Sequence, residues 1–128
     1  MIALDTCLLI DLDKQNDAAA MTLAKHTQND EPIMIASLSL HEYLVGLNEK
    51  DRVRSINNMK QLFTILEYDS EAALVSSELD SNDRLRGLPR SIGDLIISST
   101  LKRHGIKRVI TRDKNGFDYV DGLEVITY

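Results

Sequence analysis

Short apolar runs alternate with longer stretches of helical periodicity along the whole chain. The runs are brief, rich in β-branched residues and bounded by polar positions, which is typical of buried strands. The longer stretches repeat apolar residues every three or four positions, which is typical of helices that cover a core. The predicted strands are residues 2–4, 33–36, 64–66, 109–111 and 125–127, and the predicted helices are residues 7–13, 15–28, 38–48, 51–63, 70–84 and 91–104.

The order of these elements predicts the fold class. Strands separated by helices need crossover connections, so the sheet is expected to be mostly parallel and covered on both faces. Continuous rather than alternating apolar strands fit that burial. We therefore expect an α/β fold, a three-layer α/β/α sandwich, and a length of 128 residues argues for one domain over residues 1–128.

Composition excludes several classes of protein. Hydrophobic residues make up 43% of the chain, enough for one core without disulfides or a structural metal. The single cysteine, Cys7, excludes a disulfide framework and a four-cysteine zinc site. No apolar run approaches the ~20 residues that span a bilayer. The N-terminus reaches Asp5 without a basic region, so no signal peptide is expected. We expect a cytoplasmic protein with no membrane partner.

The charge is unevenly distributed. The chain carries a net charge of −5, yet residues 82–115 hold nine Lys and Arg against three Asp, so this segment is +6 and the rest is −11. Local sign matters more to a polyanionic partner than the total charge. The segment therefore fits either a solvated helix and loop edge or a surface that contacts phosphates.

Four acidic residues fall at one edge of the predicted sheet. Asp5 and Asp113 each follow a strand, and parallel strands point their carboxyl ends the same way, so both should project into one crevice. Glu42 and Asp94 lie early in helices that begin at the same edge. Carboxylates gathered in one cleft repel one another. A hard divalent cation such as Mg²⁺ or Mn²⁺, which prefers oxygen ligands, would remove that repulsion.

Each acid also has a structural interpretation. Ser39 and Glu42 have the spacing of a helix capping box, and Ser91 and Asp94 have the same spacing. The two acids that follow strands could simply begin turns. Spacing alone therefore leaves both interpretations open.

Four segments that contain the acids form a recognisable set of motifs. They are Leu4-Asp5-Thr6-Cys7-Leu8-Leu9-Ile10, Ser39-x-x-Glu42 with Tyr43-Leu44-x-x-Gly46, Asp94-Leu95-Ile96-Ile97-Ser98-Ser99 and Thr111-Arg112-Asp113-Lys114. In these motifs the chain resembles PIN domains, and in size and motif order it is most similar to the VapC-type toxin ribonucleases of prokaryotic toxin–antitoxin modules. The resemblance extends over essentially the whole chain, and four acidic motifs in the family's order are more specific than one aspartate motif alone.

The resemblance implies a metal-dependent endoribonuclease that hydrolyses RNA phosphodiester bonds with Mg²⁺ or Mn²⁺ as cofactor. It implies that the metal ligands and activators of the attacking water are Asp5, Glu42, Asp94 and Asp113. Our hypothesis within this set is that the three aspartates hold the metal, while Glu42 completes the cluster and helps to orient or deprotonate the water. Supporting hydroxyls are Thr6 and Thr111, for which helix capping is an equal alternative. The predicted contacts to the RNA backbone are Arg86, Arg90, Arg112 and Lys114.

The chain departs from the family pattern in three places. Cys7 stands where the family usually has Asn or Ser, and His41 stands where a small hydroxyl residue is frequent. The family often has a further acid just before a Phe, and here Gly116 precedes Phe117. Asn115 and Asp118 are therefore left outside the predicted core site.

The resemblance also implies protein partners. A small antitoxin is expected to cover the site with a helix or an extended tail. A homodimer is expected too, with helices 51–63 and 70–84 as its face, although core filling is the alternative for their apolar residues. Those residues are Met59, Leu62, Phe63, Leu74, Val75 and Leu79.

Two other functions remain open from the sequence. A phosphoacceptor receiver domain is also α/β and gathers acids at strand ends, with Asp69 after the third predicted strand as its acceptor. No lysine can follow the fifth strand, which runs to Tyr128, and this disfavours it. A catalytically silent module of the same fold is the third possibility, and the presence of all four acids argues against it.

Overall fold

The centre of the molecule is a five-stranded parallel sheet in the order β3-β2-β1-β4-β5. The computed structural model describes all residues from 1 to 128. Because β1 pairs with β2 on one side and with β4 on the other, the carboxyl end of β1 lies in the middle of the edge at which all the strands end. The strands are β1 (Ile2–Leu4), β2 (Ile33–Ala36), β3 (Thr64–Leu66), β4 (Arg108–Thr111) and β5 (Glu124–Thr127).

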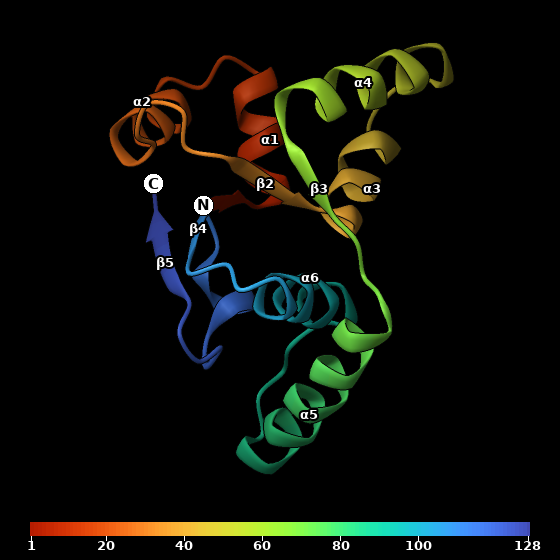
Figure 1. Ribbon diagram of the computed structural model, residues 1–128, viewed down its shortest axis with the longest axis vertical. Coiled ribbons are helices and arrows are strands. Elements are labelled where there is room, and N and C mark those ends of the chain that lie inside the picture. The colour runs from red at the N-terminus through yellow and green to blue at the C-terminus, as the bar shows by residue number, and fades with distance from the viewer.

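Helices cover both faces of the sheet. Figure 1 shows α1, α2 and α4 on one side and α5 and α6 on the other. Between these layers, α3 contacts both α1 and α6 at the carboxyl edge of the strands. The helices are α1 (Thr6–Asp13), α2 (Asp17–His26), α3 (Ser37–Val45), α4 (Glu49–Leu62), α5 (Ser70–Arg86) and α6 (Ile92–Arg103), with a short 3₁₀ helix η1 (Lys114–Phe117).

The core explains why the central strand, β1, is apolar at every position. Ile2 and Leu4 of β1 pack with residues of α1, α2 and α3, whereas Ala3 packs with α6 on the opposite face. All three are buried. A strand covered on both faces therefore has no position at which a polar residue would reach water.

At the amino edge of the sheet, one acid fastens three chain segments. Glu31 pairs with Arg108, which begins β4, and with the amino group of Met1, which precedes β1. A hydrogen bond from the backbone of Gln28, and then the bond from Arg108, lower the pKa of Glu31 to about 2. This cluster lies at the opposite end of the strands from the acids discussed below.

The predicted architecture is confirmed, and the sheet is entirely rather than mostly parallel. The strand order 3-2-1-4-5 differs from the order 2-1-3-4-5 of receiver domains, so the receiver interpretation is wrong. In addition, Asp69 caps α5 and pairs with Arg103.

No helix combines the length and apolar character needed to cross a membrane.

Candidate functional site

The first acid, Asp5, sits directly after β1 and caps α1. Its Oδ1 accepts a hydrogen bond from the Thr6 backbone N–H at 2.8 Å, and its Oδ2 accepts one from Thr111 Oγ1 at 2.7 Å. Burial raises the pKa of Asp5, the negative charge of Asp94 raises it further, and these hydrogen bonds oppose the change. Asp5 is therefore a half-buried acid that lies within the electrostatic reach of a second acid.

The second acid, Glu42, is linked to the first by a threonine. Glu42 lies in the second turn of α3, where its Oε1 accepts a hydrogen bond from Thr6 Oγ1 at 2.8 Å. The capping-box interpretation of Ser39 and Glu42 is wrong, because α3 already begins at Ser37 and its N-cap, Ala36, has no side-chain hydrogen bond. Ser39 is buried within the helix and its hydroxyl has no partner.

The third acid, Asp94, lies in the first turn of α6. Ser91 is the N-cap, and its Oγ accepts a hydrogen bond from the Asp94 backbone N–H at 3.1 Å. The predicted cap is thus present here, and it leaves the carboxylate of Asp94 free to face the sheet edge. Beside it, a Cβ placed on Gly93 would lie 3.9 Å from Glu42 Oε2, so α6 begins next to the second acid.

The fourth acid, Asp113, follows β4 and caps η1, where its Oδ1 accepts a hydrogen bond from the Asn115 backbone N–H at 3.0 Å. Thr111 connects it to Asp5, because Thr111 Oγ1 donates to Asp5 and accepts from the Asp113 backbone N–H at 3.1 Å. A cavity of about 420 Å³ lies beside these residues. Its lining is Leu88, Pro89, Arg90, Asp94, Asp113, Asn115 and Asp118.

These contacts bring all four predicted acids to one edge of the sheet. Two threonines link Asp5 to Glu42 and to Asp113, and the charge of Asp94 reaches Asp5. Asn115 and Asp118, which sequence reasoning left outside the core site, line the same cavity as two of the acids. His41 is exposed and takes no part in the network.

None of the four acids is neutralised by a basic side chain. All seven ion pairs of the structure involve other carboxylates. Two arginines close to the acids in sequence are engaged elsewhere, since Arg112 binds both carboxylate oxygens of Asp11 and Arg90 binds Asp83. The edge of the sheet therefore carries uncompensated negative charge.

The donor set fits a hard divalent cation. It consists of carboxylate and hydroxyl oxygens, and Asp5, whose pKa is raised chiefly by burial, forms no ion pair with a basic side chain. As the side chains stand, no three Asp, Glu, His or Cys residues converge on one point. Mg²⁺ does not need such a cage, because it keeps several waters and binds through one or two carboxylates together with substrate phosphates.

The predicted RNA contacts differ in availability. The prediction that Arg90 contacts the RNA backbone is wrong, because its side chain is 3% exposed and fully engaged with Asp83 and backbone carbonyls. Arg112 is exposed, but its guanidinium is held by Asp11. Arg86 stacks on the exposed ring of Tyr119 with its Cζ 4.9 Å from the ring centroid, and Lys114 is exposed at the start of η1. Arg86 and Lys114 are therefore the available cations.

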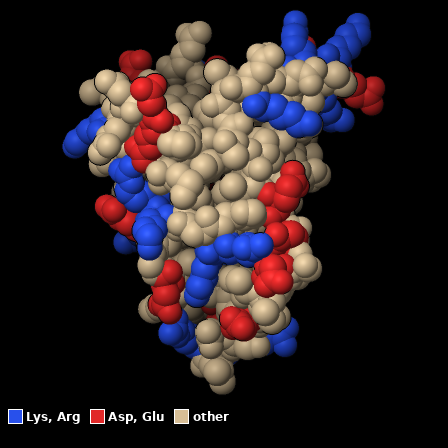
Figure 2. All heavy atoms as spheres, in the orientation of Figure 1, with Lys and Arg blue, Asp and Glu red and all other residues tan.

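The basic segment does not form a continuous basic surface on the face that Figure 2 shows, where Lys and Arg alternate with Asp and Glu. Five of its nine cations are in ion pairs with acids of the same chain. They are Arg84, Arg90, Arg103, Arg108 and Arg112.

Sequence reasoning missed several features of the site. The sulfur of Cys7 accepts a hydrogen bond from the Arg112 backbone N–H at 3.2 Å and lies 3.4 Å from Thr111 Oγ1, so it packs beside Asp5. The buried pair of Asp83 and Arg90 had no signal in the sequence beyond two charges seven positions apart. Gly116 did have a signal, because it stands where the family often has an acid.

Comparisons with known proteins agree with this geometry. The family model described as PIN domain matches residues 2–123. A search of curated proteins finds no significant match. The solved structure of VapBC2 from Rickettsia felis, bound to a DNA fragment from its promoter, contains a chain that is 20% identical, with a TM-score of 0.80 over 100% of this chain and 99% of that one.

Two further structures are similar. FitAcB from Neisseria gonorrhoeae contains a chain that is 25% identical, with a TM-score of 0.79 over 98% of this chain and 96% of that one. VapC20 from Mycobacterium tuberculosis, a sarcin–ricin loop cleaving toxin, is 17% identical, with a TM-score of 0.65 over 85% of this chain and 87% of that one.

Proposed function

Because the chain belongs to the PIN domain family, we propose that it is a Mg²⁺- or Mn²⁺-dependent endoribonuclease and the toxin of a type II toxin–antitoxin module. One observation carries the proposal: four carboxylates meet at the carboxyl edge of a parallel sheet and none has a cationic partner. The similarity to VapC20, a sarcin–ricin loop cleaving toxin, supports RNA as the substrate. That substrate places the activity in the cytoplasm.

In this proposal the acids have distinct roles. Asp5, Asp94 and Asp113 hold the metal, and Glu42 orients the attacking water and accepts its proton. Thr6 and Thr111 fix the directions of the carboxylates through the hydrogen bonds described above. A bound divalent ion supplies charge neutralisation at the scissile phosphate and a water of lowered pKa. Arg86 and Lys114 contact the RNA backbone and position the strand without reading its sequence.

The decisive experiment is a metal-titrated cleavage assay on total cellular RNA, with the fragment ends mapped. Asp5→Asn and Asp94→Asn each remove one carboxylate and keep the shape of the side chain. Both variants should lose RNA cleavage while their circular dichroism spectra remain those of the wild type. If both cleave RNA at the wild-type rate, the mechanism is refuted. Complete inactivity of the wild type with every divalent metal would instead favour the catalytically silent module.

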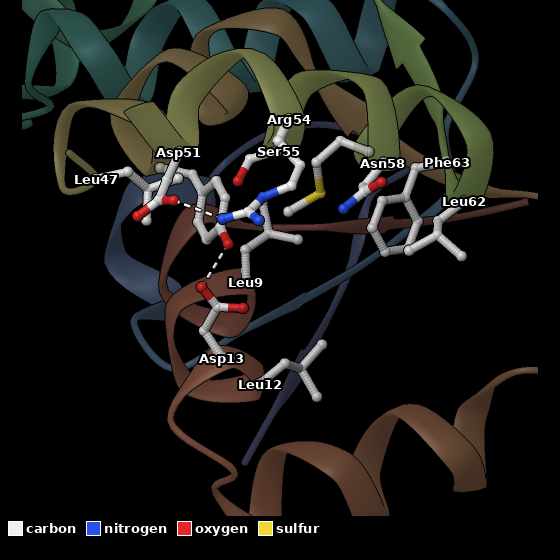
Figure 3. Close-up of a pocket in the computed structure, with 12 residues that line it drawn as sticks. Leu9, Leu12, Asp13, Leu47, Asp51, Arg54, Ser55, Asn58, Leu62 and Phe63 are labelled. Carbon is white, nitrogen blue, oxygen red and sulfur yellow. Dashed lines mark hydrogen bonds and ion pairs between the residues drawn. The ribbon is translucent and has the colours of Figure 1, made fainter. Parts of the chain in front are cut away.

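An antitoxin partner is part of the proposal, and an open groove supports it. The groove has a volume of about 510 Å³ and lies between α1, α3 and α4 (Figure 3). Tyr43 donates a hydrogen bond to Asp13 on its floor, and this bond together with burial raises the pKa of Tyr43 to about 12. Seven of the twelve lining residues are hydrophobic. They are Leu9, Leu12, Tyr43, Leu47, Met59, Leu62 and Phe63.

An apolar groove of this kind suits a partner segment that buries an amphipathic face. A toxin–antitoxin complex from Klebsiella pneumoniae contains a chain that is similar to this one, which supports a protein as the occupant. Three residues that we expected in a homodimer face, Met59, Leu62 and Phe63, line this groove instead.

The homodimer remains a prediction, and fewer apolar residues are available for its interface than we expected. Of the expected α5 residues, Leu79 is buried in the core, whereas Leu74 is 57% exposed. Sedimentation at micromolar protein concentration tests the dimer, and a monomer at every concentration would contradict it.

A further inference from the structure

A buried ion pair lies behind the acidic edge of the sheet. Arg90, in the loop before α6, donates from Nε to Asp83 Oδ2 at 2.7 Å and from Nη2 to Asp83 Oδ1 at 3.0 Å. The two side chains are 3% and 6% exposed. A charged pair this deeply buried is tolerated only when its geometry is good and its remaining donors are also satisfied.

The remaining donors of Arg90 bind the backbone of the segment that follows Asp113. Nη1 donates to the carbonyl oxygen of Gly116 at 2.9 Å, and Nη2 donates to that of Asp118 at 2.5 Å. The hydroxyl of Ser98 on α6 donates to the same Gly116 carbonyl at 2.9 Å. Three hydrogen bonds, two from Arg90 and one from Ser98, thus fix the backbone of the short 3₁₀ turn and the residue after it.

The anchored turn lies directly against one of the acids. A Cβ placed on Gly116 would lie 2.8 Å from both Cγ and Oδ1 of Asp94, and 3.1 Å from Oδ2. The φ angle of Gly116 is not in the left-handed region, so its backbone does not require glycine. The position is small because the Asp94 carboxylate occupies the space that a side chain would need.

We propose that Arg90 and Gly116 are positioning residues for the metal-binding carboxylates, an inference that rests on the proposed function. The guanidinium of Arg90 holds Gly116 by its carbonyl, and Gly116 closes one side of the space in which the Asp94 carboxylate can rotate. Because Asp113 is the N-cap of η1, the same anchor also sets the position of that acid. Arg90 and Gly116 act through the backbone of η1, and neither touches the RNA or the reacting atoms.

The first test is Gly116→Ala, which leaves every hydrogen bond of Arg90 in place. The added methyl group should turn the Asp94 carboxylate away while the fold persists, because only the end of one flexible side chain must move. We expect the dissociation constant for Mn²⁺, measured by isothermal titration calorimetry without RNA, to rise roughly 10-fold to 100-fold. The kcat for RNA should fall by a similar factor, with the unfolding temperature close to that of the wild type.

The second test is Arg90→Lys, which keeps the charge but loses the planar fork that binds Asp83 and two carbonyls together. The matched control is Arg108→Lys, which breaks a comparable pair with Glu31 at the opposite edge of the sheet. Both variants should lower the unfolding temperature. Only Arg90→Lys should weaken Mn²⁺ binding and lower kcat.

A purely structural role predicts other results. If Gly116→Ala keeps the wild-type Mn²⁺ affinity and kcat, or if Arg90→Lys loses thermal stability alone as the control does, the positioning role is overturned. Should Arg90→Lys fail to fold, Gly116→Ala decides by itself. A wild type that binds Mn²⁺ but cuts no RNA would refute the proposed nuclease, and the Mn²⁺ titrations would still decide whether the carboxylates are positioned in this way.

Discussion

At the scale of single residues, Asp5 shows how the fold and the proposed activity oppose each other. Its carboxylate is partly removed from water at the end of the central strand, and the charge of another acid, Asp94, also raises its pKa. Hydrogen bonds from Thr6 and Thr111 compensate only in part, so the pKa of Asp5 stays raised. Carrying a charge here at neutral pH therefore costs folding free energy, and a cation would recover it.

The first prediction concerns stability without metal. Because the folded-state pKa of Asp5 lies above the unfolded value, its stabilisation is present below the unfolded pKa and is lost as pH rises through the folded one. Asp5→Asn should therefore unfold at a higher temperature than the metal-free wild type at pH 7, and the difference should shrink toward pH 4. Mn²⁺ should raise the unfolding temperature of the wild type alone. Thermal melts between pH 4 and 8 check this.

Glu31→Gln is a control of opposite sign. The pKa of Glu31 is lowered to about 2, so its stabilisation is present above the unfolded pKa of 4.5 and is lost as pH falls through the folded value. This variant should be less stable than the wild type at pH 7, with or without Mn²⁺. If Asp5→Asn is also destabilised at pH 7, the hydrogen bonds of Asp5 outweigh the cost of its burial.

The sequence could predict which acids gather but not which cations are free. Asp5 and Asp113 each follow an apolar strand, and parallel strands all end at the same edge of the sheet, so the pattern predicts that these two acids lie at one edge. The fate of Arg90 depends on Asp83, which α5 brings to it only in the folded molecule. A charge pattern gives the sign of each charge and its position along the chain, but it does not show which opposite charge the folded chain brings next to it.

At the scale of secondary structure elements, the start of α6 serves two purposes. The Ser91 hydroxyl satisfies a backbone N–H that has no helical partner, and Asp94 places its charge in the first turn, where the helix dipole favours it. The cap therefore stabilises the helix and also sets the turn from which an acid reaches the sheet edge.

Ser91→Ala should cost about 1 kcal/mol of unfolding free energy, because it leaves one backbone N–H without its partner. Urea denaturation followed by circular dichroism would measure this loss. Ser91→Asp keeps an oxygen acceptor at the cap and should retain most of the stability. A Ser91→Ala variant as stable as the wild type would mean that water replaces the cap without loss.

The extent of each element was predictable where periodicity and burial agree. The predicted strands match the observed ones to within one residue. The strands β1, β2 and β4 are buried over most of their length, so their apolar runs are continuous, whereas β3 and β5 are partly exposed edges that short runs of β-branched residues still marked. The Ser39 cap failed because β2 passes into α3 without a linker, so the helix starts two residues before that serine. No pattern predicted η1, since four residues are too few to show a helical repeat.

At the scale of the whole molecule, the two proposed interactions use different surfaces. The acids lie where β1 and β4 end, whereas the groove lies between α1 and α4 and is largely apolar. Two helices contribute to both: Thr6 of α1 and Glu42 of α3 lie at the acids, whereas Leu9 of α1 and Tyr43 of α3 lie in the groove. The binding of a partner in the groove can therefore be weakened by a substitution that leaves the acids unaltered.

Leu62→Glu tests the groove as the docking site of the antitoxin. Leu62 is 69% exposed, so the fold should tolerate a charge there, whereas an apolar partner should bind about tenfold or more weakly. RNA cleavage by the free enzyme should not change. Binding is measured by calorimetry with the product of a short reading frame adjacent to the gene.

Val53→Glu is the matched control, because Val53 lies on the same helix with the same exposed fraction but does not line the groove. It should leave partner binding intact. Equal loss of binding in both variants would show that charge on α4, rather than the groove, weakens the complex.

The parallel topology also governs when activity can arise during synthesis. β1 carries the first acid and pairs with β4, which carries the last, so the central ladder joins the beginning of the chain to a strand translated much later. A nascent polypeptide that has emerged only as far as α5 lacks two of the four acids and the neighbour that anchors β1 on that side. A ribosome making this nuclease would therefore be safe from an unfinished product, and the cell would meet the hazard only in nearly complete molecules.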